Sequence, residues 1–200
     1  AWEGTDLPLE QGNWPIMAAS EQQYLQGVSQ ISRAMTRADM DEVLQQFVHA
    51  AQMAADIGVD WLELHCAHGY LLSGFISPLT NQRSDEYGGS LENRLRFPLE
   101  VFKAMRAVWP QDRPMSVRIS AHDWVPGGIT PEDAVQIAKA FKAAGADLID
   151  CSSGGNIATA RIPLSEGYQV HFSEEIRKTS VFTATVGLIT TTEKMDEILE

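Results

Sequence analysis

Residues 59–70 of the chain read VDWLELHCAHGY. The first eight of these residues form a short, mostly apolar run, which is typical of a buried β-strand. His65 lies near the end of this run, and His68, Gly69 and Tyr70 follow directly. The stretch therefore predicts a strand that carries polar, chemically competent side chains at its carboxyl end.

Three more runs of the same kind follow along the chain, over residues 115–120, 147–152 and 181–186. Segments in which apolar residues recur with helical spacing precede, separate and follow the four runs. We expect these helices from Thr36 to Gly58, over about 90–108, from Thr130 to Gly145, near 172–178 and from about Thr191. Buried strands that alternate with helices indicate a parallel sheet covered by helices.

The ends of the four strands favour one of two possible architectures. A (β/α) barrel and a doubly wound sheet both fit the order of elements, but a barrel builds its active site from many strand ends. All four strands end in polar residues or glycine, at His65, Ser120, Ser152-Ser153 and Gly187. We predict an α/β fold, a partial TIM (β/α)8 barrel of about four consecutive βα units over residues 36–200, after an irregular loop region over residues 1–35.

Composition limits the class of protein. The 200 residues carry a net charge of −12, and 44% of them are hydrophobic, which predicts a folded, acidic protein. Such a charge makes nucleic acid and membrane surfaces poor partners. Cys66 and Cys151 each lie in an apolar run and form no C-x-x-C pair, so we expect buried thiols and a cytoplasmic location. The residues indicate no signal peptide.

His65 and His68 allow more than one interpretation on their residue types alone. They could bind a metal ion, bind an oxyanion, or lie in a loop without a chemical role. A zinc site needs a third ligand, and the neighbouring sequence offers no obvious one, so we predict no metal site.

Three further residues at the strands are candidates for ligand binding. Arg118 lies inside an apolar strand, where a charge needs a partner. That partner is either an internal carboxylate, from Glu63 or Asp150, or an electron-rich ligand. Ser152 and Gly187 are small strand-end residues, which form tight turns or let a flat ring or a phosphate approach the backbone.

These segments together resemble the old yellow enzyme family of FMN-dependent oxidoreductases. The long polar loop after His-x-x-His-Gly-Tyr is the most specific part of the resemblance. The resemblance is closest to the bacterial branch with two histidines, and residues 61–154 also resemble the reductase domain of aminobenzoyl-CoA and salicylyl-CoA oxygenases. The matching segments are residues 65–71, 75–81, 83–90, 92–94, 117–120 and 150–154.

The resemblance implies catalytic roles for three residues. His65 and His68 correspond to the pair that binds the carbonyl or phenolate oxygen of the substrate. Tyr70 corresponds to the proton donor to the substrate's α carbon. The implied partner is a small molecule, an activated alkene, that takes hydride from FMN after NAD(P)H has reduced the flavin.

The resemblance also implies three cofactor-binding residues. Arg118 corresponds to the cation beside the flavin N1 and C2 oxygen, and Ser152 and Gly187 correspond to positions that line the flavin or its phosphate. The family's first three strands and last strand have no counterpart here. We therefore expect a central fragment of a barrel that binds FMN weakly and associates with itself through open sheet edges.

Three alternatives stay open at this point. The chain could be a non-catalytic barrel fragment or interaction module. It could belong to the iron–sulfur flavoenzymes of the dienoyl-CoA reductase group, whose cluster segment lies beyond the barrel. A metal-dependent hydrolase that uses His65 and His68 is the remaining possibility.

Overall fold

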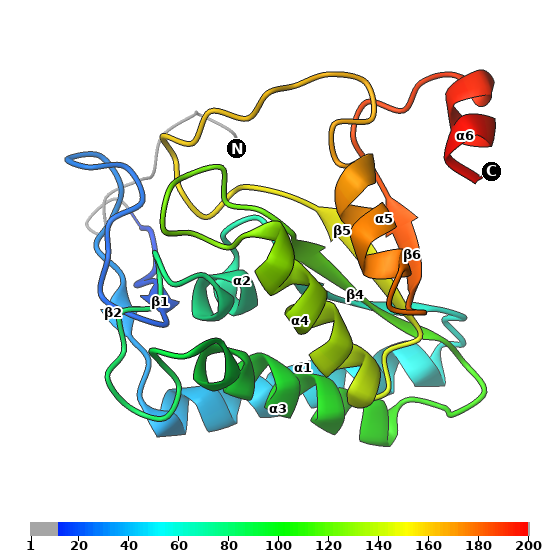
Figure 1. Cartoon of the computed structure of the whole chain (residues 1–200). Helices are drawn as coiled ribbons and strands as arrows, with labels where there is room; N and C mark the ends of the chain where they lie inside the picture. Colours follow the sequence, from blue (N-terminus) through cyan, green and yellow to red (C-terminus); the bar gives the residue numbers. More distant parts are fainter. Residues whose placement is uncertain (1–11, 200) are drawn as a thin grey trace.

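The computed structural model of the protein describes residues 12–199. Four parallel strands form one sheet in the order β3-β4-β5-β6, which is also their order along the chain (Figure 1). Their bounds are Leu62–Cys66 for β3, Met115–Ser120 for β4, Leu148–Ser152 for β5 and Phe182–Thr185 for β6. Neighbouring strands in sequence are thus neighbours in the sheet, as in a (β/α) barrel.

Helices precede, separate and follow the strands, and most of them lie on one face of the sheet, whereas α6 stands apart from the sheet and buries no side chain (Figure 1). They are α1 at Arg37–Asp56, α2 at Leu71–Ile76, α3 at Leu91–Val108, α4 at Pro131–Ala143, α5 at Val170–Arg177 and α6 at Thr192–Leu199. The predicted α/β fold with part of a TIM barrel is confirmed. No helix among residues 12–199 is both long and apolar enough to cross a membrane.

The helix starts and stops follow the capping signals in the sequence. Thr36 and Thr130 are the N-caps of α1 and α4, and each forms a capping box with an aspartate three residues later. Gly58 and Gly145 follow the ends of these helices with φ of +85° and +104°, a left-handed conformation that glycine adopts without strain. Local chemistry therefore sets these boundaries.

Two features differ from the sequence prediction. The loop after Tyr70 contains the short helix α2, which is almost entirely buried. Residues 12–35 are not wholly irregular, because β1 at Met17–Ala18 pairs in parallel with β2 at Arg33–Ala34. Both elements are too short to show a hydrophobic period, and both form through contacts with distant parts of the chain. Residues 1–11 of the predicted loop lie outside the described residues.

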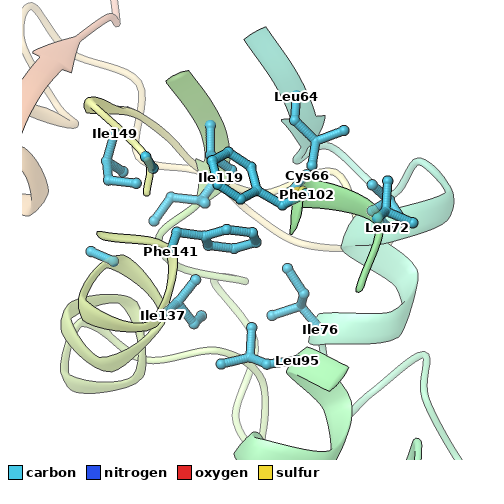
Figure 2. Close-up of a cluster of buried hydrophobic side chains, with 14 of the residues drawn as sticks. Leu64, Cys66, Leu72, Ile76, Leu95, Phe102, Ile119, Ile137, Phe141 and Ile149 are labelled. Carbon is cyan, nitrogen blue, oxygen red and sulfur yellow. The ribbon is translucent and has the colours of Figure 1, made fainter. Parts of the chain in front are cut away.

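The hydrophobic core lies between the sheet and α3 and α4. Figure 2 shows Leu64, Ile119 and Ile149 of three successive strands facing the aromatic rings of Phe102 and Phe141. All five side chains are at most 1% exposed. This face of the sheet is therefore apolar and structural.

The two cysteines belong to the same core, as predicted. Cys66 and Cys151 are free and buried. Burial raises the pKa of the Cys151 thiol to about 12 and raises that of Cys66 as well. Both side chains therefore pack as small hydrophobes and are not reactive nucleophiles.

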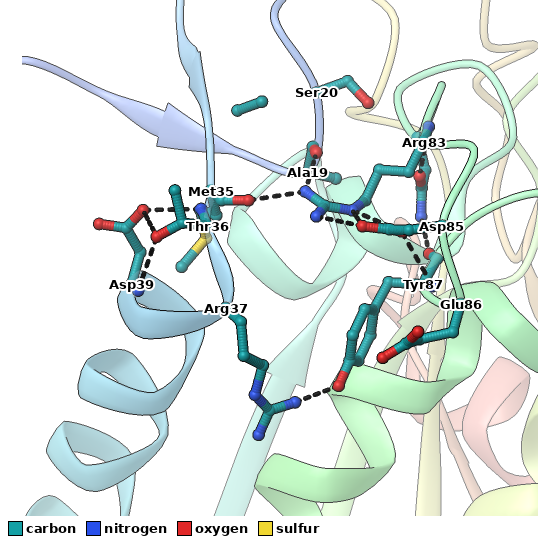
Figure 3. A network of polar contacts seen from close by, with 12 residues as sticks. Ala19, Ser20, Met35, Thr36, Arg37, Asp39, Arg83, Asp85, Glu86 and Tyr87 are labelled. Carbon is teal, nitrogen blue, oxygen red and sulfur yellow. Dashed lines mark hydrogen bonds and ion pairs between the residues drawn. The ribbon is translucent and has the colours of Figure 1, made fainter.

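A polar network attaches residues 12–35 to the long loop that follows α2 (Figure 3). The Arg83 guanidinium donates to the carbonyl oxygens of Ala19 and Met35 at 2.9 and 2.8 Å, and it pairs with Asp85 at 2.6 Å. One side chain thus joins the residues that follow β1 and β2 to the loop.

Side chains of the loop and of α3 hold this part of the chain in place. Asp85 takes part in the network, and Arg94 donates to the carbonyl oxygen of Ile76 at 2.7 Å. The loop is thus held by the Arg83–Asp85 ion pair and by hydrogen bonds from arginine and asparagine side chains to backbone carbonyl oxygens.

Candidate active site

The sheet face opposite the core carries polar side chains. His65, Arg118 and Asp150 are register partners on β3, β4 and β5, so they form one row across the sheet. Successive residues of a strand point to opposite faces, and the neighbours of this row on each strand belong to the core. The strand pattern therefore separates a structural face from a face with ionisable groups.

The structure brings together the three residues predicted to be catalytic. The ring centroids of His65 and His68 lie 5.1 Å apart, and those of His65 and Tyr70 lie 5.3 Å apart. Tyr70 is 64% exposed, so its hydroxyl can reach a bound molecule. Burial lowers the pKa of both imidazoles below the usual 6.5, and the Arg118 cation lowers it further. Both histidines are therefore neutral near pH 7.

Backbone packing fixes the position of His68. This residue has φ of +62°, and its backbone N–H donates to the Ser120 hydroxyl at 2.9 Å. A Cβ atom at Gly155 would lie 2.3 Å from the His68 Cα, so only glycine allows this approach. Gly155, which follows β5, is thus in contact with the histidine loop.

Ser152 lies against His68. Its hydroxyl oxygen is 2.6 Å from the His68 Nε2, and the residue is 4% exposed. Ser152 is thus part of the histidine cluster, and its predicted contact with a flavin stays a prediction.

Gly187 lies apart from the histidines, beyond β6 at the other end of the sheet from β3. It has φ of +124°, and its carbonyl oxygen accepts a hydrogen bond from the Gly167 N–H at 2.9 Å. A Cβ atom here would lie 2.9 Å from the Tyr168 ring, which explains the glycine locally. Its role in cofactor binding stays a prediction.

Arg118 has an internal partner but retains hydrogen-bonding capacity. Its Nε lies 3.3 Å from Asp150 Oδ2, so Asp150 is the carboxylate that pairs with it, whereas Glu63 accepts from the Ser116 hydroxyl. The ion pair is not aligned as a hydrogen bond. Arg118 Nε and Asp150 Oδ1 are buried and have no hydrogen-bond partner among residues 12–199.

The incomplete pairing of Asp150 has an electrostatic consequence. Burial raises the pKa of this carboxyl, and Arg118 offsets part of that increase. A half-buried arginine whose buried Nε has no hydrogen-bond partner within residues 12–199 is suited to bind a further electron-rich group.

Sequence reasoning did not single out Gln169 and Trp124, which contact the serines at the end of β5. Gln169 is 1% exposed and joins the end of β5 to the carbonyl oxygen of Val186 after β6. Trp124 donates its indole N–H to the Ser153 hydroxyl at 2.9 Å. Gln169 and Trp124 lie in long connections without periodicity, so no sequence signal identifies them.

A second buried network joins the loops around the histidines. The Asp123 carboxylate accepts from the Ser77 hydroxyl at 2.6 Å and from the Asn156 amide at 2.7 Å. Asn156 in turn accepts from Ser73 of α2 at 2.8 Å. Within residues 12–199, no group of three or more His, Cys, Asp or Glu side chains could hold a metal ion.

Comparisons with known proteins agree with this geometry. A family model described as NADH:flavin oxidoreductase / NADH oxidase family matches residues 5–200. An NADPH dehydrogenase of Geobacillus sp. (strain WCH70) is 49% identical over 168 residues, which are 84% of this chain and 48% of the relative. The chain spans about half the length of the curated relatives it matches.

Two solved structures share the fold over most of the chain. A 2-naphthoyl-CoA reductase in complex with 2-naphthoyl-CoA has a TM-score of 0.83 and 28% identity, covering 92% of this chain and 28% of that one. The old yellow enzyme homologue from Zymomonas mobilis has a TM-score of 0.74 and 26% identity, covering 93% and 54%. The chain belongs to the NADH:flavin oxidoreductase / NADH oxidase family.

Proposed function

We propose that this chain supplies the substrate-oxygen site and part of the flavin site of an FMN-dependent NAD(P)H oxidoreductase of the ene-reductase type. The single observation that carries the proposal is the placement of His65, His68 and Arg118 at the ends of adjacent strands on one polar face. The family match and the relatives named NADPH dehydrogenase support this proposal.

Arg118 fits the edge of a flavin ring. Its buried Nε has no hydrogen-bond partner among residues 12–199, and the flavin N1 and C2 oxygen are acceptors that gain negative charge on reduction. When bound, FMN accepts hydride from NAD(P)H and passes it to an activated alkene. Arg118 stabilises the negative charge at the flavin's N1 edge, and Asp150 holds the arginine in place.

The two histidines bind the substrate oxygen. Because their pKa values are lowered, they are neutral at pH 7 and donate hydrogen bonds from ring N–H groups. Two donors on one carbonyl oxygen polarise the conjugated alkene and make its β carbon more electrophilic. Tyr70 then supplies a proton to the α carbon from the exposed side of the site.

The residues support placement in the two-histidine branch of the family. Both histidines lie beside Arg118, so both are available to one substrate oxygen. The similarity to a reductase solved with a CoA thioester is consistent with an activated carbonyl compound as the substrate class.

A chimeric protein tests the proposal. Residues 12–199 replace the corresponding half of the Geobacillus NADPH dehydrogenase, and FMN binding is measured by flavin absorbance and fluorescence. We expect a yellow protein, whereas the 200-residue chain alone binds FMN more weakly. Arg118→Met in the chimera reduces FMN affinity about tenfold or more, which is about 1.4 kcal/mol, because the cation at the flavin's edge is lost.

Arg118→Lys is the matched control, because it keeps the charge and is expected to restore part of the affinity. A folded chimera that binds no FMN contradicts the proposal. Equal FMN affinity in the parent chimera and Arg118→Met contradicts the role of the arginine.

A further inference from the structure

We infer that Ser152 is a positioning residue that holds neutral His68 with its ring proton on Nδ1. Hydrogen-bond geometry within this chain places the proton on Nδ1. The use of that proton in substrate binding rests on the proposed function. Successive contacts at the ends of β5 and β6 run from Gln169 through the two serines to His68. They determine which side-chain atoms donate hydrogen bonds and which accept them.

The orientation of the Gln169 amide comes first. Gln169 Nε2 lies 3.0 Å from the carbonyl oxygen of Val186, which is only an acceptor. The amide nitrogen must therefore face Val186, because the reverse orientation would place two acceptors together. Gln169 Oε1 consequently faces the serines after β5 and can only accept.

The proton of Ser153 follows from this orientation. The indole N–H of Trp124 donates to Ser153 Oγ at 2.9 Å, since an indole nitrogen cannot accept. Ser153 Oγ lies 2.5 Å from Gln169 Oε1 and must place its own proton there. The Gln169 oxygen therefore already receives a short hydrogen bond from Ser153.

Ser152 has two possible acceptors, and the distances decide between them. Its Oγ is 2.6 Å from His68 Nε2 but 3.5 Å from Gln169 Oε1. A separation of 2.6 Å suits an O–H donor, whereas N–H donors to oxygen are usually about 2.9 Å away. The Ser152 hydroxyl therefore donates to His68 Nε2, and this nitrogen carries a lone pair.

The proton of neutral His68 then resides on Nδ1. Which nitrogen of an imidazole carries the proton is set by the hydrogen bond that the other nitrogen makes. His68 Nδ1 has no hydrogen-bond partner within the described part of the chain, so this N–H is available to a ligand. In the proposed function, Ser152 thus makes His68 a fixed donor to the substrate oxygen.

The test measures the tautomer directly by long-range ¹H–¹⁵N NMR of the ¹⁵N-labelled 200-residue chain at about pH 8, without ligand. The His68 signals are assigned by their loss in His68→Asn. We expect a protonated, pyrrole-like Nδ1 and a pyridine-like Nε2. In Ser152→Ala the equilibrium should shift toward the Nε2–H form, which an unconstrained imidazole favours.

Ser153→Ala is the matched control, because it removes the adjacent hydroxyl and leaves the bond to His68 in place. Its His68 shifts should match those of the parent, and Ser152→Thr, which keeps a hydroxyl, should restore the Nδ1–H form. A parent protein with the proton on Nε2, or a Ser152→Ala variant with unchanged His68 shifts, overturns the inference. Because no flavin or substrate is present, this result is independent of whether the chain binds FMN.

Discussion

His65 and Arg118 are register partners on neighbouring strands, so an imidazole and a guanidinium lie side by side on the polar face of the sheet. The cation lowers the pKa of His65 and of His68, in addition to the larger effect of burial. Neutral histidines beside a fixed positive charge form a site that attracts an electron-rich oxygen.

This relationship predicts a pH dependence of stability. The folded pKa values of His65 and His68 lie below the usual 6.5, so the unfolded chain binds protons first as the pH falls. The free energy of unfolding should therefore decrease below about pH 6.5 and level off once the folded histidines are also protonated. Urea denaturation at about pH 8 and about pH 5.5 measures the difference.

A double variant checks that His65 and His68 cause the decrease in unfolding free energy at low pH. His65→Asn/His68→Asn should lose part of the decrease, whereas His49→Asn, at an exposed position of α1, should keep it. The same pH dependence in the parent and the double variant would refute the explanation.

Tyr70 should act in protonation and contribute little to binding. Its ring packs 5.3 Å from His65 and is mostly exposed, so Tyr70→Phe keeps the packing and removes the hydroxyl. In the FMN-loaded chimera, reoxidation of the reduced flavin by an enone should slow by about 10²–10⁴-fold, the usual contribution of a general acid.

Stopped-flow absorbance follows that half-reaction. Reduction of the flavin by NADPH, which does not use this proton, serves as the internal control and should not change. If Tyr70→Phe reoxidises at the parental rate, Tyr70 is not the proton donor.

Arg83 should stabilise the attachment of residues 12–35. Arg83→Ala removes hydrogen bonds to the carbonyl oxygens of Ala19 and Met35 and the ion pair with Asp85. Hydrogen bonds from charged groups contribute about 1.5–3 kcal/mol each, so we expect a loss of about 2 kcal/mol or more in unfolding free energy. Amide exchange in residues 12–35 should accelerate.

Arg83→Lys provides the comparison, because one ammonium group cannot replace a planar fork with several donors. It should give an intermediate loss. Unchanged amide exchange in residues 12–35 of Arg83→Ala would show that other contacts hold this segment.

The chain should associate with itself at micromolar concentration. Within residues 12–199, β3 and β6 end the sheet without a further strand, and Trp61 and Phe182 are 49% and 65% exposed. Open edges and exposed aromatic side chains favour pairing with a second copy. Light scattering should detect dimers, and Phe182→Asp should weaken them, while a monodisperse monomer of the parent would disprove this expectation.

Most of the fold could be predicted because local chemistry determines it. The capping threonines at Thr36 and Thr130 and the glycines at Gly58 and Gly145 set helix boundaries, and the apolar strands follow from their composition. The short elements α2, β1 and β2 could not be predicted, because long-range contacts such as those of Arg83 hold that region together.

The resemblance identified the site residues that lie in its matching motifs. Site residues outside those motifs could not be predicted. The structure groups His65, His68, Tyr70 and Arg118, and the roles that the resemblance implies for them stay predictions. The contact between Ser152 and His68 spans 84 positions in sequence, and Gln169 lies in a connection without a motif. Such contacts depend on how strand ends meet in space, which residue types alone do not specify.

Phenol titration of the FMN-loaded chimera tests whether the histidine pair binds the substrate oxygen, because a phenolate over an oxidised flavin gives a long-wavelength charge-transfer band. We expect this band in the parent chimera. His65→Ala should need at least about tenfold more phenol or show no band, since a donor to the phenolate oxygen is lost. Identical phenol titrations of the parent and His65→Ala would contradict the assignment of this histidine pair as the oxygen-binding site.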